Sequence, residues 1–204
     1  ERLGLLIIDE EQHFGVSHQE KLKALREDVP VLPLSATPLP RPLQLSLSVV
    51  REMRLIATPP TDRLAVRTFI TPFDSVMIRE AIQRERFRGG QVFCVLPRLA
   101  DLDRMAERLA EIVPDAKVIQ AHGRLTPTEL ERVMTEFADG KYDILLSTNI
   151  VESGLDMPSV NTIIIHRADM FGLGQLSQLR ARVGRGKPRG YACLTSPQTN
   201  PPSA

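Results

Sequence analysis

The sequence predicts an α/β fold in which parallel strands alternate with helices, and three observations indicate it. Short apolar runs rich in Ile, Leu and Val recur along the 204 residues, as is typical of strands buried on both faces. Segments with helical periodicity separate these runs. Turn residues and prolines divide the pattern into two series, 1–58 and 64–204. We therefore expect two units, each built of strands covered by helices.

The first series is the shorter one. Its expected elements are, in order, strand 3–9, helix 18–28, strand 29–35, a possible helix 41–50 and strand 53–58. The stretch "TPPTDR" (58–63) predicts a linker, because paired prolines stop both helix and sheet. These strands are few for a sheet of their own, so we expect the chain to be part of a longer protein.

The second series carries a longer alternation. Its expected elements are strand 65–73, helix 74–90, strand 91–96, helix 99–114, strand 117–122, helix 126–140, strands 142–148 and 161–168, helix 173–184 and strand 190–196. The helix at 126–140 has a clear start signal. Thr126 can act as its N-cap, Pro127 fits its first position, and Glu129 can close a capping box.

Composition limits the classes of function. The 26 Lys and Arg nearly balance the 25 Asp and Glu, so any site for a polyanion must be local. The absence of Trp disfavours base stacking as the main binding device. Cys94 and Cys193 lie in apolar runs and predict buried free thiols in a reducing compartment. The sequence has no bilayer-length apolar run and no signal peptide, so we expect a cytoplasmic protein with no membrane partner. Its histidines are scattered and form no set of zinc ligands, so we expect no zinc site.

The first strand ends in acids, as "LLIIDEEQ". In open parallel sheets, ligands bind beyond the carboxyl ends of the strands. Asp9 and Glu10 fall at such an end, which is the layout of a Walker B element: one acid orients Mg²⁺ and the next polarises the water that attacks the γ-phosphate. The alternative is a pair of solvated loop acids. "SATP" (35–38) ends the next strand, where Ser35 and Thr37 either sense the phosphate or satisfy a local turn.

A third group of polar residues lies near the end of the chain. "STNIVESGLDMP" (147–158) places Glu152, Gly154 and Asp156 in a loop between two apolar strands. "QLRARVGR" (178–185) follows on the expected helix, where Arg182 and Arg185, three residues apart, can share one face. Two guanidinium groups on one face suit a triphosphate whose charge grows in the transition state. The alternative is a solvated basic helix end.

Together these segments resemble the superfamily 2 helicases and translocases: "DEEQ" motif II, "SATP" motif III, "STNIVESGLDMP" motif V and "QLRARVGR" motif VI. Within that superfamily the sequence looks most like the bacterial transcription-repair coupling factors, the Mfd family. The link "IATPPTDRLAV" and the stretch "RADMFGLGQL" favour that family over the related fork-reversal helicases of the RecG type. The resemblance extends to about Ser196.

The resemblance implies RecA-like parallel sheets flanked by helices. Residues 1–58 would be the C-terminal part of the first lobe, 59–63 a linker, 64–196 the second, helicase C-terminal lobe, and 197–204 a tail. It implies an ATP-driven translocase on double-stranded DNA that displaces stalled RNA polymerase and couples transcription to nucleotide excision repair. The RNA polymerase and repair-protein contacts would lie outside this sequence.

The resemblance also implies roles for single residues. Asp9 would order Mg²⁺ through water, Glu10 would activate water, and Gln12 would link the nucleotide to the other lobe. The remaining roles are nucleotide binding by Glu152, Gly154, Asp156 and Gln178, coupling of hydrolysis to DNA grip by Ser35 and Thr37, and arginine fingers at Arg182 and Arg185. ATP and Mg²⁺ are the implied cofactors.

DNA contact is expected at loops after strands of the second series, where backbone N–H groups and short polar side chains hold phosphates without reading bases. The candidates are Arg98, His122, Gly123 and Thr148.

The sequence departs from the family pattern in places. Ala181 stands where the family usually has Gly, and Asn149 and Pro42 where it usually has Thr. No G-x-x-x-x-G-K-[ST] phosphate loop is present, so we expect these 204 residues alone to be inactive as an ATPase. Two other functions stay open: another superfamily 2 helicase, such as a RecG-like enzyme, and a non-catalytic module that binds nucleic acid or protein.

Overall fold

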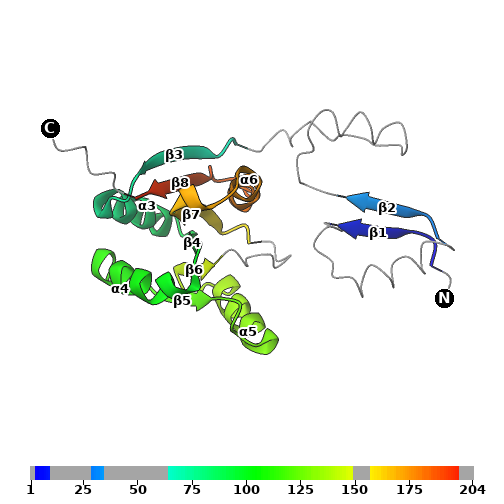
Figure 1. Cartoon of the computed structure of the whole chain (residues 1–204), viewed down its shortest axis with the longest axis horizontal. Coiled ribbons are helices and arrows are strands. Elements are labelled where there is room, and N and C mark those ends of the chain that lie inside the picture. Colours follow the sequence, from blue (N-terminus) through cyan, green and yellow to red (C-terminus); the bar gives the residue numbers. More distant parts are fainter. Residues whose placement is uncertain (1–2, 10–28, 35–63, 149–156, 198–204) are drawn as a thin grey trace. The chain divides into compact units, whose positions relative to one another are not determined.

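The computed structural model describes residues 3–9, 29–34, 64–148 and 157–197. The chain divides into two compact units, 1–55 and 56–204, and Figure 1 shows the elements of both. The predicted helices at 18–28 and 41–50, the strand at 53–58 and the linker at 59–63 lie outside the described residues. None of the helices in the described part is long and apolar enough to cross a membrane.

The described part of the first unit is a pair of parallel strands. Strand β1 (Leu6–Asp9) pairs with β2 (Val31–Leu34), and Asp9 lies opposite Leu34. Both strands are shorter than their apolar runs, which start at residues 3 and 29. The parallel pairing brings the carboxyl ends of the two runs to the same edge.

The second unit contains a six-stranded sheet in the order β3-β8-β7-β4-β6-β5, and all its pairings are parallel. The strands are β3 (Arg67–Pro72), β4 (Gln91–Leu96), β5 (Val118–Ala121), β6 (Ile144–Thr148), β7 (Val160–His166) and β8 (Tyr191–Ser196). The strand predicted at 91–96 matches β4 residue for residue. The predicted parallel α/β class is confirmed.

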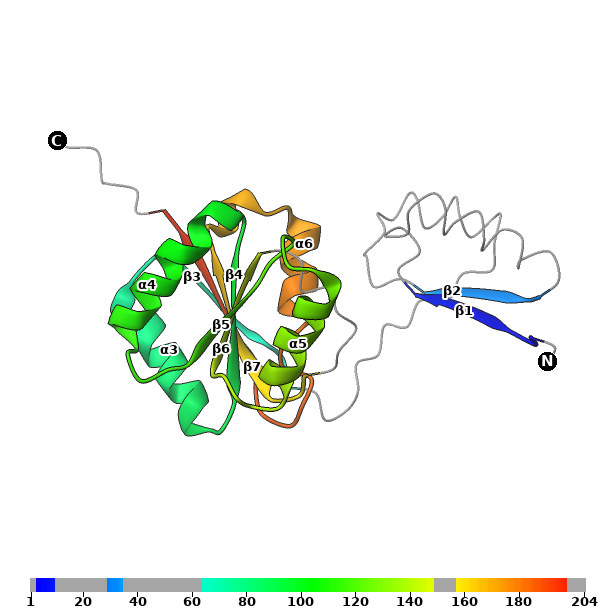
Figure 2. The same ribbon diagram turned by 90° about the horizontal axis from the view of Figure 1, so that it is seen from below.

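Helices cover both faces of this sheet, as Figure 2 shows in a view from the edge of the sheet. The helices are α3 (Ser75–Phe87), α4 (Leu102–Ile112), α5 (Pro127–Ala138) and α6 (Leu173–Arg180), with short 3₁₀ turns η2 (Leu99–Asp101) and η3 (Ala168–Met170). Helices α3 and α4 pack on one face, and α5 and α6 on the other. Consecutive parallel strands need a crossover connection, which is usually a helix, and this explains most of the alternation in the sequence.

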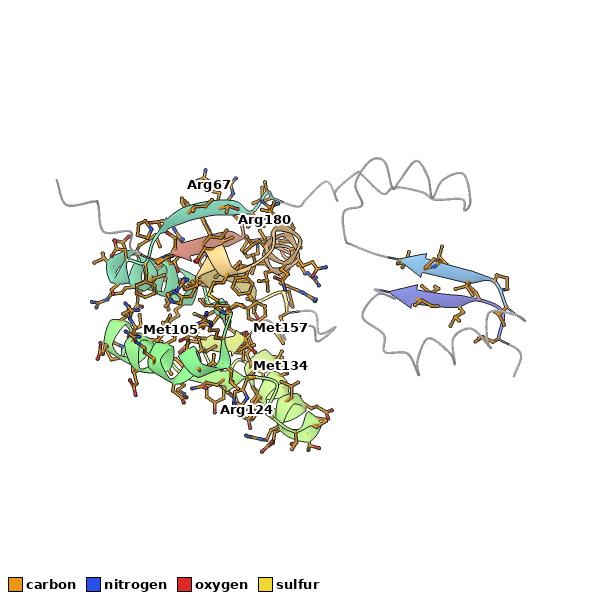
Figure 3. The ribbon with its side chains drawn as sticks, viewed as in Figure 1. Arg67, Met105, Arg124, Met134, Met157 and Arg180 are labelled. Atoms are coloured by element: carbon orange, nitrogen blue, oxygen red, sulfur yellow. The ribbon has the colours of Figure 1, made fainter. Side chains whose placement is uncertain are left out.

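The core consists of two apolar layers separated by the sheet. Alternate residues of β4 enter opposite layers, with Phe93 on the α5 side and Cys94 on the α3 side. Figure 3 shows the same division in Met134 and Met105, which lie on opposite sides of the strands. Cys94 and Cys193 are buried and unpaired, as predicted, and burial raises the pKa of the Cys94 thiol to about 12.

The predicted capping box at the start of α5 is confirmed. The Thr126 side chain accepts from the backbone N–H of Glu129, and the Glu129 carboxylate accepts from the backbone N–H of Thr126 at 2.8 Å. The backbone N–H of Thr126, followed by its hydroxyl group at 2.8 Å, donates to the Glu129 carboxylate and lowers the pKa of Glu129. This helix start is therefore fixed by side chains that are close in sequence.

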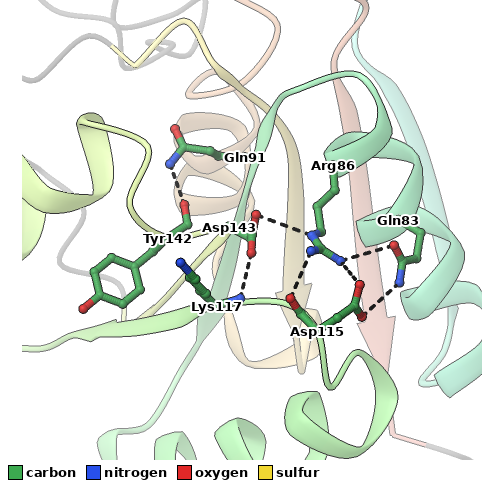
Figure 4. A network of polar contacts seen from close by, with 7 residues as sticks. All are labelled: Gln83, Arg86, Gln91, Asp115, Lys117, Tyr142 and Asp143. Atoms are coloured by element: carbon green, nitrogen blue, oxygen red, sulfur yellow. Dashed lines mark hydrogen bonds and ion pairs between the residues drawn. The ribbon is translucent and has the colours of Figure 1, made fainter.

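An ion-pair network ties the amino ends of the strands together (Figure 4). Arg86, at the end of α3, pairs with Asp115 at 2.6 Å and with Asp143 at 3.4 Å. The Asp143 carboxylate also accepts from the backbone N–H of Lys117 at 2.7 Å. The hydrogen bond from Arg86 lowers the pKa of Asp115. The network joins the segments that lead into β4, β5 and β6, so we assign it a structural role.

Gln91 is a buried polar hub at the same edge. Its amide nitrogen donates to the carbonyl oxygens of Phe137 (2.6 Å) and Tyr142 (2.7 Å), and its amide oxygen accepts from the Ser159 hydroxyl at 2.6 Å. One side chain therefore joins the first residue of β4 to the end of α5 and to the segments before β6 and β7. Figure 4 shows its contact with Tyr142.

Replacing Gln91 with leucine should lower the free energy of unfolding by about 3 kcal/mol, because a polar group left buried without its partner costs about 1–3 kcal/mol. Urea denaturation of the 204-residue protein measures the change. Gln120→Leu is the matched control, since its side chain makes a single long hydrogen bond of 3.4 Å to Asp103. Equal destabilisation by the two changes would show that the hydrogen bonds of Gln91 contribute no more to the free energy of unfolding than that of Gln120.

Candidate nucleotide-binding and nucleic-acid-binding sites

The acid-bearing end of β1 lies at the edge of the first unit where the sequence places Mg²⁺. Asp9 is the last residue of β1 and lies opposite Leu34, the last residue of β2. Glu10 follows Asp9 directly in the sequence, and Ser35 follows Leu34. The register therefore agrees with a site shared by motifs II and III. The side chain of Asp9 and the predicted site residues Glu10, Gln12, Ser35 and Thr37 lie outside the described residues.

The residues expected to contact DNA gather at the carboxyl edge of the six-stranded sheet. Arg98 follows β4, Thr148 ends β6, and His122 and Gly123 follow β5. Because β4, β6 and β5 are neighbours in that order, these residues form a row along one edge, which we call the DNA-contact row after its predicted role. Thr148 pairs in register with Leu96, two residues before Arg98. Arg98 and Gly123 are exposed, His122 is half-buried and Thr148 is buried.

Two buried polar atoms near this row have no hydrogen-bond partner among the residues that the structure describes. They are Nδ1 of His122 and Oγ of Ser147. The two residues lie on adjacent strands, since Ala121 pairs in register with Ser147. Buried polar atoms are usually paired in folded proteins, so each orphan needs an explanation. Here the two unpaired atoms, Nδ1 of His122 and Oγ of Ser147, lie beside the residues predicted to contact phosphates.

The two predicted arginine fingers lie in a turn after α6 and not on a helix, which corrects the helix expected at 173–184. Helix α6 ends at Arg180, and the backbone N–H of Arg182 donates to the Leu179 carbonyl at 3.1 Å, in a tighter turn. Val183 is fully buried, and Gly184 has a φ of +69°. The left-handed conformation of Gly184 is incompatible with a helix that continues to this residue, and glycine adopts it without steric cost.

Close packing holds this turn in place. A Cβ atom at Gly184 would come within 3.1 Å of the Val66 side chain and 3.3 Å of the Gly190 backbone. The side chain of Arg185 folds back, and its Nε donates to the Ala181 carbonyl at 3.2 Å. Arg182 is half-buried and Arg185 is exposed. This turn, which we call the arginine turn, therefore carries Arg182 and Arg185 on a closely packed backbone.

Two other residues of the same motif are described. Ala181, where the related family usually has Gly, has a φ of −70° and is exposed. The backbone at this position therefore does not require glycine, and the added methyl group points to no crowded site within the described unit. Gln178 lies on α6, one turn before Arg182, and is half-buried.

The arginine turn and the DNA-contact row lie at opposite edges of the sheet. Helix α6 begins after the carboxyl end of β7 and leads to the amino end of β8, so the turn lies at the amino edge. The predicted nucleotide-binding residues Glu152, Gly154 and Asp156 lie outside the described residues. Pro158, two positions after Asp156 in the sequence, is described: its carbonyl oxygen lies 3.3 Å from a Cβ built on Gly186. The described end of motif V, at Pro158, thus approaches the residue that follows motif VI.

Sequence analysis missed Arg167, the first residue after β7. It is the only non-glycine residue with positive φ in the described part of the chain, at 54°. Its guanidinium binds the carboxylate of Asp169 through two nitrogens, at 3.0 and 2.9 Å. This pair raises the pKa of Arg167 and lowers the pKa of Asp169. A basic residue directly after a strand was the available signal, although sequence pattern does not indicate a left-handed arginine.

Comparison with known proteins gives a family to this arrangement. The chain matches the helicase conserved C-terminal domain over residues 75–187. It is 56% identical over 95% of its length to the transcription-repair-coupling factor of Rickettsia typhi, and 51% identical over 96% to that of Escherichia coli. The chain spans 17% of the length of each of these relatives.

Solved structures show the same relationship. RecG bound to a three-way DNA junction superposes with a TM-score of 0.76 and 39% identity, over 98% of this chain and 26% of that one. Yeast Dbp5 bound to RNA and ADP BeF3 superposes with a TM-score of 0.67 over 98% of this chain and 55% of that one, and at 15% identity it shows a shared fold. The match over 75–187 includes the DNA-contact row and the arginine turn, and the chain therefore belongs to the family of the helicase conserved C-terminal domain.

Proposed function

We propose that this sequence is the motor portion of an ATP-dependent translocase on double-stranded DNA of the transcription-repair-coupling type. The observation that carries the proposal is the identity of 49–56% to transcription-repair-coupling factors along nearly the whole chain. The order of the acid pair, "SATP", the 147–158 loop and the arginine turn supports it. The full-length protein would displace stalled RNA polymerase and recruit excision-repair proteins through other regions, in the cytoplasm.

In this proposal the first unit supplies the acids of ATP hydrolysis. The donor chemistry fits Mg²⁺, because Asp9 ends a parallel strand and Mg²⁺ prefers carboxylate and water oxygens. Bound Mg²⁺ would neutralise phosphate oxygens. Asp9 would hold the ion through water, and Glu10 would accept the proton of the attacking water. Gln12 would connect this site to the second unit, with Ser35 and Thr37 linking hydrolysis to DNA grip.

In the second unit, residues at the amino edge would contact the nucleotide and residues at the carboxyl edge would hold DNA. Arg182 and Arg185 would stabilise the charge that grows on the γ-phosphoryl group. Gln178 and the loop with Glu152, Gly154 and Asp156 would contact the nucleotide. Arg98, His122, Gly123 and Thr148 would contact backbone phosphates, which give affinity without base specificity.

A fork-reversal activity of the RecG kind is the second candidate. The identity of 39% to RecG bound to a three-way DNA junction favours it specifically. The two functions differ in the DNA that stimulates them: a translocase of the first kind uses linear duplex, whereas a fork-reversal enzyme requires a branched substrate.

ATP hydrolysis by the full-length protein carrying this sequence tests the proposal. We expect linear duplex DNA to stimulate hydrolysis and the protein to strip a triplex-forming oligonucleotide from that duplex. The 204-residue chain alone should do neither. Stimulation by three-way junctions but not by linear duplex would favour the RecG-like function. If neither DNA stimulated any ATP hydrolysis, the result would favour the alternative function, a non-catalytic module that binds nucleic acid or protein.

A further inference from the structure

The residue that interrupts the regular backbone at the carboxyl edge is Arg167. The left-handed region costs a non-glycine residue about 1–2 kcal/mol, and such strain concentrates at functional sites. The ion pair with Asp169 does not offset it, because both side chains are about 40% exposed (39% and 40%) and exposed pairs stabilise little. What the geometry does achieve is a fixed direction for the guanidinium, held by two parallel hydrogen bonds.

The surroundings of Arg167 add to the positive character of this edge. The preceding residue, His166, is half-buried, with Nδ1 at 3.0 Å from the Thr195 hydroxyl and its ring edge against Phe73. The Arg108 guanidinium lies over the Phe73 ring, 4.0 Å from its centroid. Burial, followed by the charges of Arg108 and Arg167, lowers the pKa of His166. Two arginine charges therefore act on His166, while the charges of Asp101 and Asp169 oppose them.

The strand order places Arg167 in line with the DNA-contact row. Strands β7, β4, β6 and β5 are consecutive in the sheet, so their carboxyl ends carry, in order, Arg167, Arg98, Thr148 and His122. At about 4.8 Å between strands, this extended row is about 14 Å long. One strand of B-form DNA advances about 3.4 Å along its axis per phosphate. The extended row is therefore long enough to meet more than one phosphate of one strand.

We propose that Arg167 is a phosphate-backbone contact for duplex DNA, and that Asp169 both orients its guanidinium and competes with the phosphate for it. The inference rests on the proposed function, which supplies the DNA. In the free protein the guanidinium fork is bound to a carboxylate. A phosphate has matching geometry and replaces that partner on binding, which leaves Asp169 as a nearby negative charge that limits affinity.

The proposal predicts effects of opposite sign at the two partners. Arg167→Gln in the full-length protein should make the negative slope of log K against log salt, where K is the association constant for duplex DNA, shallower by about 0.9, because one fewer counterion is released. At about 100 mM salt this corresponds to an affinity about eightfold weaker. Asp169→Asn should tighten binding by about two- to fivefold, since the competing charge of an exposed pair is removed. If the pair only held the loop in shape, both variants would weaken binding.

Fluorescence anisotropy with a labelled linear duplex, from about 50 to 300 mM salt, measures these slopes. Arg132→Gln is the matched control: it removes the same charge from an exposed arginine that pairs with Glu136 at 3.3 Å on α5. Arg167→Gly removes the charge and also relieves the left-handed backbone, so a slope reduced in this variant too excludes misfolding as the cause. A slope unchanged in both Arg167 variants, or lowered equally in Arg132→Gln, overturns the inference while the proposed function stands. If the wild-type protein binds no duplex DNA, the proposed function itself fails.

Discussion

Replacing Arg182 or Arg185 with glutamine in the full-length protein should reduce kcat for DNA-stimulated ATP hydrolysis by about 10³-fold or more, because an arginine finger contributes about 10³–10⁵ in rate. The effect should be on kcat, since the guanidinium interacts most strongly with the charge that develops in the transition state. Duplex binding by either variant should stay near the wild-type value, because the turn lies at the edge of the sheet opposite the DNA-contact row.

Lysine and a neighbouring arginine provide the controls for this prediction. Arg182→Lys keeps the charge but loses the planar fork, so it should recover little of the rate. Arg180→Gln removes an exposed charge three residues from Val183, at the last position of α6, and should retain most of the activity. If the protein without Arg182 and Arg185 hydrolysed ATP at the wild-type rate, the assignment of these residues as arginine fingers would be wrong.

Changing Glu10 to glutamine should lower kcat by about 10²–10⁴-fold, the range typical of a lost general base. The amide has nearly the same shape as the carboxylate but cannot accept the proton of the attacking water. Binding of ATP should persist, so a fluorescent ATP analogue should bind the variant with an affinity close to that of the wild-type protein. Steady-state hydrolysis with duplex DNA measures the loss of rate.

The sequence offers its own matched control in Glu11, the third acid of "DEEQ". Glu11→Gln makes the same chemical change one residue further along and should leave kcat within a few-fold of wild type. Asp9→Asn should instead raise the Mg²⁺ concentration needed for half-maximal hydrolysis, because a neutral amide is a weaker ligand for a hard cation. Equal rates for Glu10→Gln and the wild-type protein would mean that the base lies elsewhere.

Local chemistry explains which elements were predictable from the sequence. The start of α5 follows from Thr126, Pro127 and Glu129, which interact within one helical turn. The six residues of β4, Gln91 followed by five apolar residues, lie between Gly90 and Pro97 and give a strand whose bounds match the prediction. In both cases the determining residues are neighbours in the chain, so the local sequence pattern predicts where the element begins or ends.

The end of α6 was not predictable for the opposite reason. Periodicity continues to residue 184, but the helix stops at Arg180 because Val183 enters the core and Gly184 packs on Val66 and Gly190. Val66 is far away in the sequence. The arginine turn therefore depends on a long-range contact, and its position at the amino edge becomes evident only in the fold.

The candidate DNA-contact row shows the same limit. Residues after strand ends were identified as contacts one by one, because parallel strands share one ligand-binding edge. Their order along that edge depends on the strand order, which places β6 between β4 and β5 and puts β7 beside β4. Arg167 was missed since left-handed backbone is rare for arginine and leaves no pattern in the sequence.

Strand β7 runs buried from Val160 to the half-buried His166 and is central to the sheet. Seven residues at about 3.3 Å each make a rod about 20 Å long, and close-packed interiors of this kind deform little. One tip of the rod is next to the proline whose carbonyl approaches the arginine turn, and the other carries Arg167. If the proposed function holds, we expect a displacement at one edge of this unit to reach the opposite edge through a strand that bends little.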